Sequence, residues 1–257
     1  MEHGELRRLL IEELLAESPR YRGTAVPTEK EEQKRLLRGL MNLRRPGPVS
    51  EDFLRRQDEY LTAAIEERGI TDVRSLPVSA EGFSLWQGDI TLLRCDAIVN
   101  AANSGMTGCY VPCHSCIDNC IHTYAGVQLR LKCAELMEIQ GHEEPTGRAK
   151  ITPGYNLPCK YVIHTVGPIV DGPLTGEHCA LLASCYRSCL AIAEENGCES
   201  IAFCCISTGV FGFPKREAAQ IAVRTVRDWK SETGSAIRVV FNVFGDEDLA
   251  IYRRILS

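Results

Sequence analysis

The first 75 residues carry apolar side chains at the spacing of amphipathic helices. In the first segment these positions are Leu9, Leu10, Ile11, Leu14 and Leu15. Pro19 follows and ends the pattern. Charges of both signs alternate on the outer faces, which favours a solvated helical cap packed on the main domain over a separate functional module.

The boundaries of two further N-terminal helices are marked by capping residues. Thr28 with Glu31 matches a capping box, and the helix that it opens should end before Arg45-Pro46. Ser50, which acidic residues follow, predicts the start of a third helix, and Gly69 ends it.

From about residue 80 the pattern changes to short apolar runs that alternate with longer helical ones. Strands are expected at Phe83–Trp86, Ala97–Asn100, Ala149–Thr152, Tyr161–Thr165, Ser200–Phe203 and Arg238–Val243. Helices are expected at Asp118–Gln140, Glu177–Glu195, Lys215–Thr233 and Glu247–Leu256. This alternation predicts a three-layer α/β/α domain with a mixed central sheet at residues 79–257, preceded by a helical extension at residues 1–78. Ligands of such folds bind beyond the carboxyl ends of the strands.

Composition and charge narrow the classes of function. The 257 residues are 44% hydrophobic with a net charge of -5, and no basic block is interleaved with aromatics, so extended nucleic-acid binding is not expected. No uncharged run approaches the roughly 18 apolar residues of a membrane span, and the first residues do not resemble a secretory signal. We therefore expect a cytoplasmic protein without a membrane partner, whose 13 cysteines are mostly small buried hydrophobes rather than disulfides.

Three loops after predicted strands share small and polar residues. Ser207, Thr208, Gly209 and Gly212 precede a helix and suit an anion that backbone N–H groups could bind. Asp89 could accept a hydrogen bond from the amino group of a base or cap the turn that follows it. Asn103 could likewise serve a ligand or form a turn. None of these loops decides the function by itself.

The segment Gly108–His122 holds four cysteines and two histidines in fifteen residues. Thiolate and imidazole in one short loop suit Zn²⁺, with three protein ligands and an open fourth position at a catalytic site. Three alternatives stay open at this point. They are a disulfide such as Cys109–Cys116, a redox pair Cys113-x-x-Cys116 before a helix, and a structural zinc with Cys113 as the fourth ligand.

Five motifs in order resemble the macrodomain family, which binds ADP-ribose. They are QGDIT (87–91), AIVNAANSGM (97–106), CIDNCIHTYAG (116–126), TPGYNLPCKYVIHTVGP (152–168) and CISTGVFGFP (205–214). The resemblance extends from about residue 83 to residue 257, and its wording is most similar to the hydrolase branch. It implies a macrodomain at residues 79–257.

The resemblance also implies roles for individual residues. Asp89 and Ile90 would bind the adenine end, with the Asp89 carboxylate on the amino group. Asn103 would bind the distal ribose, and Asp118 would orient or deprotonate a water, which makes these two the candidate catalytic residues. The diphosphate would lie against a loop whose residues are Ser207, Thr208, Gly209, Val210 and Phe211, with Phe211 also lining the ribose side.

The loop before Asp118 departs from ordinary hydrolytic macrodomains, where this segment is short and rich in glycine. It resembles a zinc-containing subgroup with the pattern G-C-x-x-P-x-H-x-C-I-D-N-x-I-H. This pattern selects Cys109, His114 and Cys116 as ligands of one Zn²⁺ per chain. Cys113 falls at a variable position. Cys120 and His122 fall inside the following helix, where they are expected to pack or hydrogen-bond, with His122 as a satisfied histidine beside the ribose pocket rather than a metal ligand.

The expected function is zinc-dependent removal of mono-ADP-ribose from protein side chains, with an aspartate or glutamate ester as the linkage. The product would be ADP-ribose, and the enzyme class that of a de-ADP-ribosylating glycosyl hydrolase. The resemblance further implies an association with a sirtuin-type transferase and a lipoyl-carrier protein. Two rival functions are a reader that binds ADP-ribose without turnover and a deacetylase of acetylated ADP-ribose.

Overall fold

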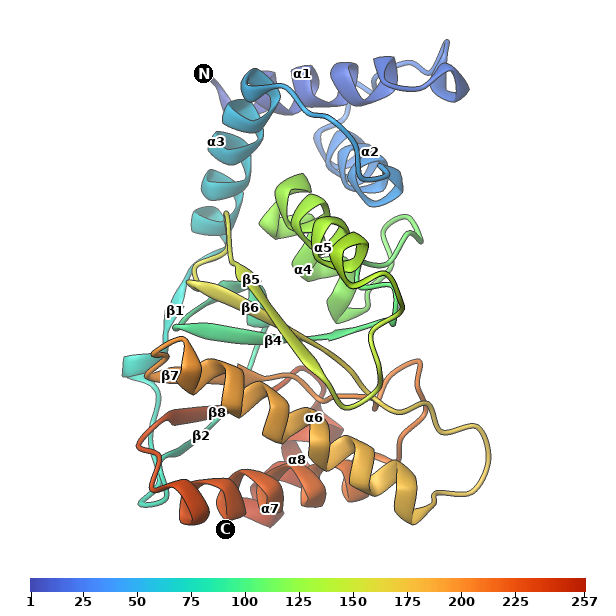
Figure 1. Cartoon of the computed structure of the whole chain (residues 1–257). Helices are drawn as coiled ribbons and strands as arrows, with labels where there is room; N and C mark the ends of the chain where they lie inside the picture. The colour runs from blue at the N-terminus through green and yellow to red at the C-terminus, as the bar shows by residue number, and fades with distance from the viewer.

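The centre of the chain is a six-stranded mixed sheet in a computed structural model that describes residues 1–257 (Figure 1). Its strands are β2 (Phe83–Gln87), β4 (Ala97–Ala102), β5 (Ala149–Pro153), β6 (Tyr161–Val166), β7 (Ser200–Phe203) and β8 (Arg238–Val243). They lie in the order β2-β8-β7-β4-β6-β5, where only β5 runs antiparallel to its neighbour. All six strands expected from the sequence are found. Two-residue strands β1 (Thr71–Asp72) and β3 (Leu93–Arg94) form a separate parallel pair that the sequence pattern did not predict.

Helices cover both faces of this sheet, which confirms the three-layer α/β/α prediction. One face carries α4 (Ile117–Ala125) and α5 (Val127–Gln140), and the other carries α6 (Gly176–Glu195), α7 (Lys215–Thr233) and α8 (Asp246–Leu256) (Figure 1). Forty-five buried apolar residues form one continuous core around the sheet. No helix of the chain combines the length and apolar character that crossing a bilayer requires.

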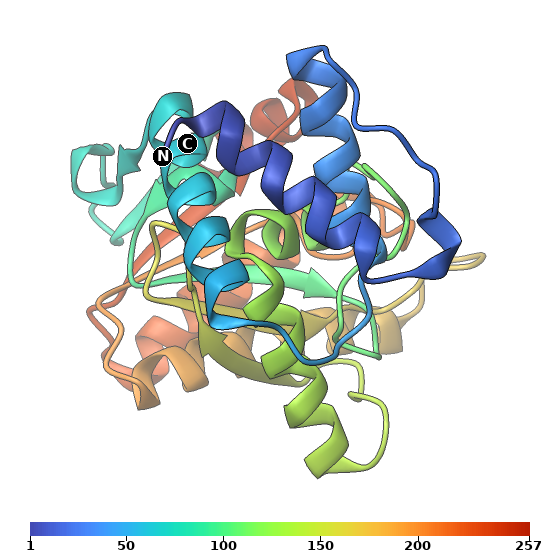
Figure 2. The same ribbon diagram turned by 90° about the horizontal axis from the view of Figure 1, so that it is seen from above.

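The N-terminal helices form a further layer outside α4 and α5 (Figures 1 and 2). They are α1 (His3–Ala16), α2 (Lys30–Leu43) and α3 (Glu51–Arg68). Short 3-10 turns occur at η1 (Pro19–Tyr21), η2 (Val73–Ser75) and η3 (Ile90–Leu92). The three helices bury a small core of their own, whose eleven residues are Leu6, Leu10, Ile11, Leu14, Leu37, Leu40, Met41, Phe53, Tyr60, Leu61 and Val127. Val127 belongs to α5, so this core closes only against the main domain.

The helix predicted at Asp118–Gln140 is in fact two helices that meet at Gly126. The φ angle of Gly126 is 95°, which an L-residue rarely adopts, and an added Cβ would lie 2.5 Å from Nε2 of Gln57. Gln57 is fully buried, and its Oε1 accepts a hydrogen bond from the Val127 N–H at 2.9 Å. A side chain of the N-terminal extension thus satisfies the first turn of α5, and the break could not be predicted from helical spacing alone.

Of the two predicted capping residues, the one for α3 is confirmed and the one for α2 is wrong. Ser50 accepts a hydrogen bond from the Phe53 N–H at 3.1 Å and caps α3 as expected. Thr28 does not cap α2, because the N-cap is Glu29 and no side chain accepts a bond there. Gln33 instead reaches back and donates to the Pro27 carbonyl at 2.7 Å, which holds the chain at the helix entry.

Loss of a side chain in the small core should destabilise the whole protein. Leu10 has 0% of its surface exposed, so Leu10→Ala is expected to lower the free energy of unfolding by about 2–5 kcal/mol. Urea denaturation followed by circular dichroism would measure the loss. Leu9→Ala, one residue away at a partly exposed position, is the control and should cost much less. Equal unfolding free energies for the two variants would contradict a stabilising role for this core.

Candidate active site

Three loops lie along one edge of the sheet, at the carboxyl ends of its parallel strands. They follow β2, β7 and β4, which occupy the first, third and fourth places in the strand order. Strands are about 4.8 Å apart, so the row from β2 to β4 spans about 14 Å. Every residue that the sequence analysis assigned to a ligand lies in these loops or in the segment that runs from β4 into α4.

Asp118 lies in the first turn of α4 with its carboxylate buried and oriented. Asn100 donates to Oδ1 at 2.8 Å, and Asn103 donates to Oδ2 at 3.2 Å. Asn100 belongs to the buried strand β4, whereas Asn103 stands exposed just beyond its end. The two asparagines therefore fix both carboxylate oxygens, and the amide of one of them remains accessible to a ligand.

The environment of Asp118 also sets its acidity. Burial raises the pKa of this carboxyl to about 6, while the hydrogen bond from Asn100 favours the ionised form and opposes the rise. A carboxylate with a pKa near neutrality can accept a proton efficiently at physiological pH. Asp118 is therefore the candidate general base of this site.

Cys109, His114 and Cys116 come together in front of α4. The Cys109 Sγ lies 3.8 Å from the His114 Nδ1, and the ligand atoms of all three residues lie within 4.8 Å of one another. Cys116 is the N-cap of α4 and its Sγ accepts from the Asn119 N–H at 3.4 Å. The residues that the sequence pattern selected as a triad are thus adjacent in space, and the last of them, Cys116, lies two positions before Asp118.

Cys113 and Cys120 turn away from this triad. The Cys113 N–H donates to Oδ1 of Asn42 at 2.9 Å, and its Sγ donates to the Arg35 carbonyl at 3.3 Å. Arg38 donates to the Cys120 Sγ at 3.5 Å from the opposite helix. Both thiols therefore contact α2, and all 13 cysteines of the chain are free.

His122 lies on α4 and packs there, which is one of the two expected alternatives, but its ring is not satisfied by hydrogen bonds as expected. Neither ring nitrogen has a hydrogen-bond partner, and Nε2 lies 3.5 Å from Oδ1 of Asp118. A Cβ on Gly108, whose φ is 86°, would lie 2.8 Å from the His122 ring. The ring is thus a packing surface for the loop backbone, and burial lowers the pKa of His122 well below its ordinary value.

The loop after β7 exposes backbone donors. The N–H groups of Gly209, Val210 and Phe211 take part in no backbone hydrogen bond, and Val210 is 80% exposed. Ser207 has a φ of 66° and is buried, with Thr208 bonded to the Cys205 carbonyl behind it. Free backbone N–H groups in a turn just before a helix are the kind of donors that bind an anion.

Asp89, which follows β2 at one end of this edge, accepts hydrogen bonds with both carboxylate oxygens. Its Oδ1 accepts from the N–H and hydroxyl of Thr91, at 2.9 and 2.7 Å, and Ile90 beside it is buried. Its Oδ2 accepts from Arg68 at the end of α3, and this guanidinium also lies 4.3 Å above the Tyr124 ring. The capping role considered for Asp89 is observed, and Arg68 is a neighbour that sequence reasoning missed.

Phe244 was also missed, although it stands exposed at the same edge. It directly follows β8 and is 79% exposed, and Gln87 of the adjacent strand donates to its carbonyl at 3.2 Å. An exposed aromatic ring near Asp89 offers a face on which a nucleotide base can stack. The available signal was an aromatic residue placed immediately after an apolar strand.

Behind Asp118 lies a buried polar network that the sequence analysis did not identify. Asn100 also donates to Nδ1 of His164 at 3.1 Å, and Nε2 of His164 lies 2.9 Å from the Thr152 hydroxyl. His122, Cys133 and His164 form a second buried group of possible metal ligands, but the contact with Thr152 already occupies one of the nitrogens. Polar residues inside apolar strands were the signal for this network.

His164 should make stability depend on pH. Burial lowers the pKa of His164 to about 3, whereas an unfolded histidine titrates near pH 6.5. The unfolded state then binds a proton that the folded state does not, so the free energy of unfolding should fall between about pH 6.5 and 3, by up to about 1.4 kcal/mol per unit. Thermal melting across this range would measure the slope. His164→Asn should reduce the slope by the contribution of one proton and leave that of the other buried histidine, His122, whose pKa burial also lowers. Replacement of the exposed His142 should leave the slope unchanged. An unchanged slope in His164→Asn would contradict this origin.

The chain is similar in sequence and in structure to proteins that are already known. The model of the Macro domain family matches residues 99–222. A protein-ADP-ribose hydrolase of Treponema medium is 60% identical over 261 residues, covering 100% of both chains. A protein of the same name from Staphylococcus aureus (strain MSSA476) is 52% identical over 230 residues, which cover 89% of this chain and 86% of the relative. The Trypanosoma brucei macrodomain solved in complex with ADP-ribose aligns with a TM-score of 0.67 at 30% identity, covering 85% of this chain and 95% of that chain.

Proposed function

The chain belongs to the Macro domain family, and from this premise we propose that it binds ADP-ribose and hydrolyses its bond to modified proteins. The observation that carries the proposal is the contact between Asn103 and Asp118 at the carboxyl edge of the sheet. An accessible amide that binds a sugar hydroxyl and a buried carboxylate that accepts a proton are what hydrolysis at the distal ribose requires. Relatives that are 52% and 60% identical to this chain are named protein-ADP-ribose hydrolases, which supports the proposal.

The ligand would extend along the three loops of the edge. Asp89 and Ile90 would take the adenine, with Phe244 as a stacking surface, and the free amides of Gly209 to Phe211 would bind the diphosphate. Asn103 would then lie at the distal ribose. This order follows the strand order, because the loops after β2, β7 and β4 succeed one another along the edge.

Asp118 would act on the water that attacks C1 of the distal ribose. The new bond joins the water oxygen to C1, the bond from C1 to the carboxylate oxygen of the target breaks, and Asp118 accepts a proton of the water. The target side chain leaves as a carboxylate and needs no proton. We therefore propose an aspartate or glutamate ester as the linkage, because a single base then suffices.

The residues in front of α4 fit a zinc ion. Two thiols and one imidazole are the donor types that Zn²⁺ prefers, and their ligand atoms lie within 4.8 Å of one another. Cys109, His114 and Cys116 would hold the ion and leave its fourth position open. Burial raises the pKa of the Cys116 thiol to about 12, so binding of a cation there would release a proton. A bound zinc would supply Lewis-acid polarisation of a substrate or water oxygen.

The target and the compartment are further proposals. A lipoyl-carrier protein modified by a sirtuin-type transferase is a proposed target, which rests only on the resemblance to the zinc-containing subgroup. The cytoplasm is the proposed compartment, and 13 free cysteines support it because thiols stay reduced there.

Turnover of a defined substrate tests the function. The metal-replete protein would be incubated with a target ADP-ribosylated on aspartate or glutamate, and release of ADP-ribose would be followed by chromatography. Release is expected, and tight ADP-ribose binding without release would instead favour a reader. Parallel assays with acetylated ADP-ribose would identify a deacetylase if the metabolite were the faster substrate.

A further inference from the structure

The loop that carries the cysteine–histidine triad has little structure of its own. It contains no helix or strand between Asn103 and Ile117, and three of its residues, Met106, Gly108 and Cys113, have φ angles of 60°, 86° and 56°. The only backbone hydrogen bonds that begin and end within it join Met106 to the Asn103 carbonyl and His114 to the Val111 carbonyl. Its shape must therefore be set by the elements that pack against it.

Helix α2 of the N-terminal extension makes direct hydrogen bonds to this loop. The guanidinium of Arg38 donates to the His114 carbonyl at 2.7 Å and to Oδ1 of Asn119 at 2.9 Å. Asn42, one turn later, accepts from the Cys113 N–H. Asn42 is itself buried and donates to the Thr123 hydroxyl of α4 at 2.9 Å. One face of α2 thus binds the loop and the helix that the loop enters.

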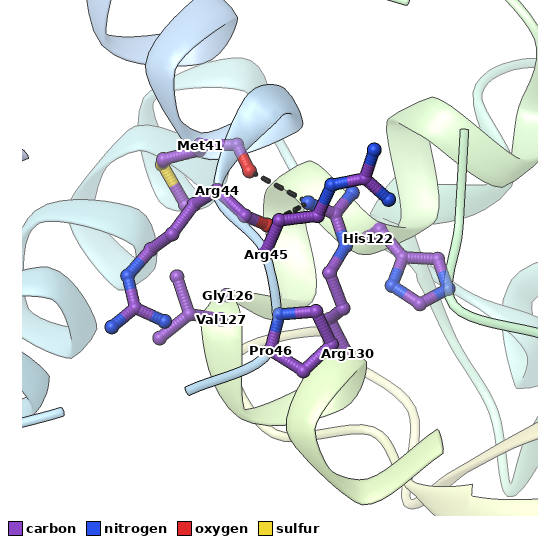
Figure 3. Close-up of a pocket in the computed structure, with 8 residues that line it drawn as sticks. All are labelled: Met41, Arg44, Arg45, Pro46, His122, Gly126, Val127 and Arg130. Atoms are coloured by element: carbon purple, nitrogen blue, oxygen red, sulfur yellow. Dashed lines mark hydrogen bonds between the residues drawn. The ribbon is translucent and has the colours of Figure 1, made fainter. Parts of the chain in front are cut away.

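The end of α2 holds the beginning of the loop through Arg130 of α5. Arg130 Nη1 donates to the carbonyls of Met41, Asn42 and Arg44, as Figure 3 shows for two of them, and its Nε donates to the Thr107 carbonyl at 2.8 Å. The Tyr110 ring is contacted by two guanidinium groups, with Arg45 at 4.2 Å and Arg130 at 4.4 Å from its centroid. The loop is therefore fixed on both sides of Cys109.

Arg38 reaches two of the three triad members. It bonds the carbonyl of His114 itself, and it bonds the side chain of Asn119, whose backbone N–H donates to the Cys116 Sγ. The Asn119 side chain also donates to the Val111 carbonyl at 3.0 Å, inside the loop. Arg38 contacts no ligand atom of the triad, so its influence acts through the backbone and through Asn119.

We propose that helix α2 sets the conformation of the loop that carries the cysteine–histidine triad, and that Arg38 is the main residue of α2 that positions this loop. This inference rests on the proposed zinc site and goes beyond it, because it assigns a role to the N-terminal extension. Residues that orient metal ligands from outside the coordination sphere change metal affinity by about 10–100-fold. The extension is then part of the active site rather than a solvated cap.

Variants of two arginines on α2 test the proposal. The affinity for zinc would be measured by competition with the coloured chelator 4-(2-pyridylazo)resorcinol. Arg38→Ala should bind zinc about 10–100-fold more weakly than the native chain. Arg38→Lys, which retains a donor and a charge, should fall between the two. Arg35→Ala is the matched control, since its side chain is exposed and only its backbone carbonyl contacts the loop. Melting temperatures of the metal-free proteins and binding of ADP, which lacks the distal ribose, should change little in all variants.

The outcomes separate this inference from the zinc proposal. Cys109→Ser serves as the reference for a lost site. Zinc retention by Arg38→Ala equal to that of the native chain, while Cys109→Ser loses the metal, would overturn the role of Arg38 and leave the triad intact. A native chain that takes up no zinc would overturn the metal site first. If Arg38→Ala does not fold, Arg38→Lys decides the question. The proposal would be refuted if the folded Arg38→Lys variant bound zinc with the same affinity as the native chain and the Arg35→Ala control.

Discussion

Asp118→Ala should lower turnover by a factor of about 10²–10⁴ while ADP-ribose binding is retained. The carboxylate is held by Asn100 and Asn103 and is the buried base of the proposed site, so its removal takes away the proton acceptor but not the loops that hold the nucleotide. Steady-state release of ADP-ribose and calorimetric titration with ADP-ribose would measure the two quantities separately.

Two further variants sharpen this experiment. Asp118→Asn keeps the size of the side chain without its basicity and should lose as much activity as the alanine variant. Asp228→Ala, an exposed carboxylate on α7 without a hydrogen-bond partner in the chain, should behave as the native protein. A nearly active Asp118→Asn would show that the residue only positions the substrate.

Cys109→Ser is expected to lose both the metal and at least about 100-fold of the turnover, because removal of a ligand should exceed the effect of a residue that only orients one. Elemental analysis should give about one zinc per native chain and much less in the variant. Cys116→Ser should follow Cys109→Ser.

Cys113→Ser is the control that the structure selects for this experiment. The Cys113 thiol donates to the Arg35 carbonyl, a bond that a serine hydroxyl can replace, and it points away from the triad. The variant should keep both zinc and activity. Zinc loss from Cys113→Ser equal to that of Cys109→Ser would assign four protein ligands and a structural site. A fully active native protein without metal would reject zinc catalysis altogether.

The strands and most helices could be predicted from the sequence because their signals are local. Buried parallel strands are short apolar runs, and Ser50 or Gly69 marks a helix end through its own backbone chemistry. The break at Gly126 was missed because its reason lies elsewhere in the chain, in the Gln57 side chain that fills the space beside the glycine. Thr28 failed for a related cause, since Gln33 holds the entry to α2 in its place.

In the candidate site, too, residues with a local sequence signal could be predicted and residues contributed from a distance could not. Cys109, His114 and Cys116 are close in sequence, so their spacing carried the information that brings them together. Arg38 and Arg68 come from the extension, up to 82 residues away from their partners, and their patterns are those of ordinary helix surfaces. Nothing in the local sequence distinguishes an arginine that faces solvent from one that holds a loop.

Because Gln57 pairs with the start of α5, the N-terminal helices cannot finish folding until α5 has been synthesised. Gln57 and Gln128 are 71 residues apart, and the ribosome adds about 5–20 residues per second, so α3 waits roughly 4–14 s for its partner to be made. During that interval the apolar faces of α1 to α3 have only one another to cover them, because Val127 has not yet emerged. The N-terminal helices are made before residue 128 but can complete their packing only after it, so their apolar faces stay incompletely covered for that interval.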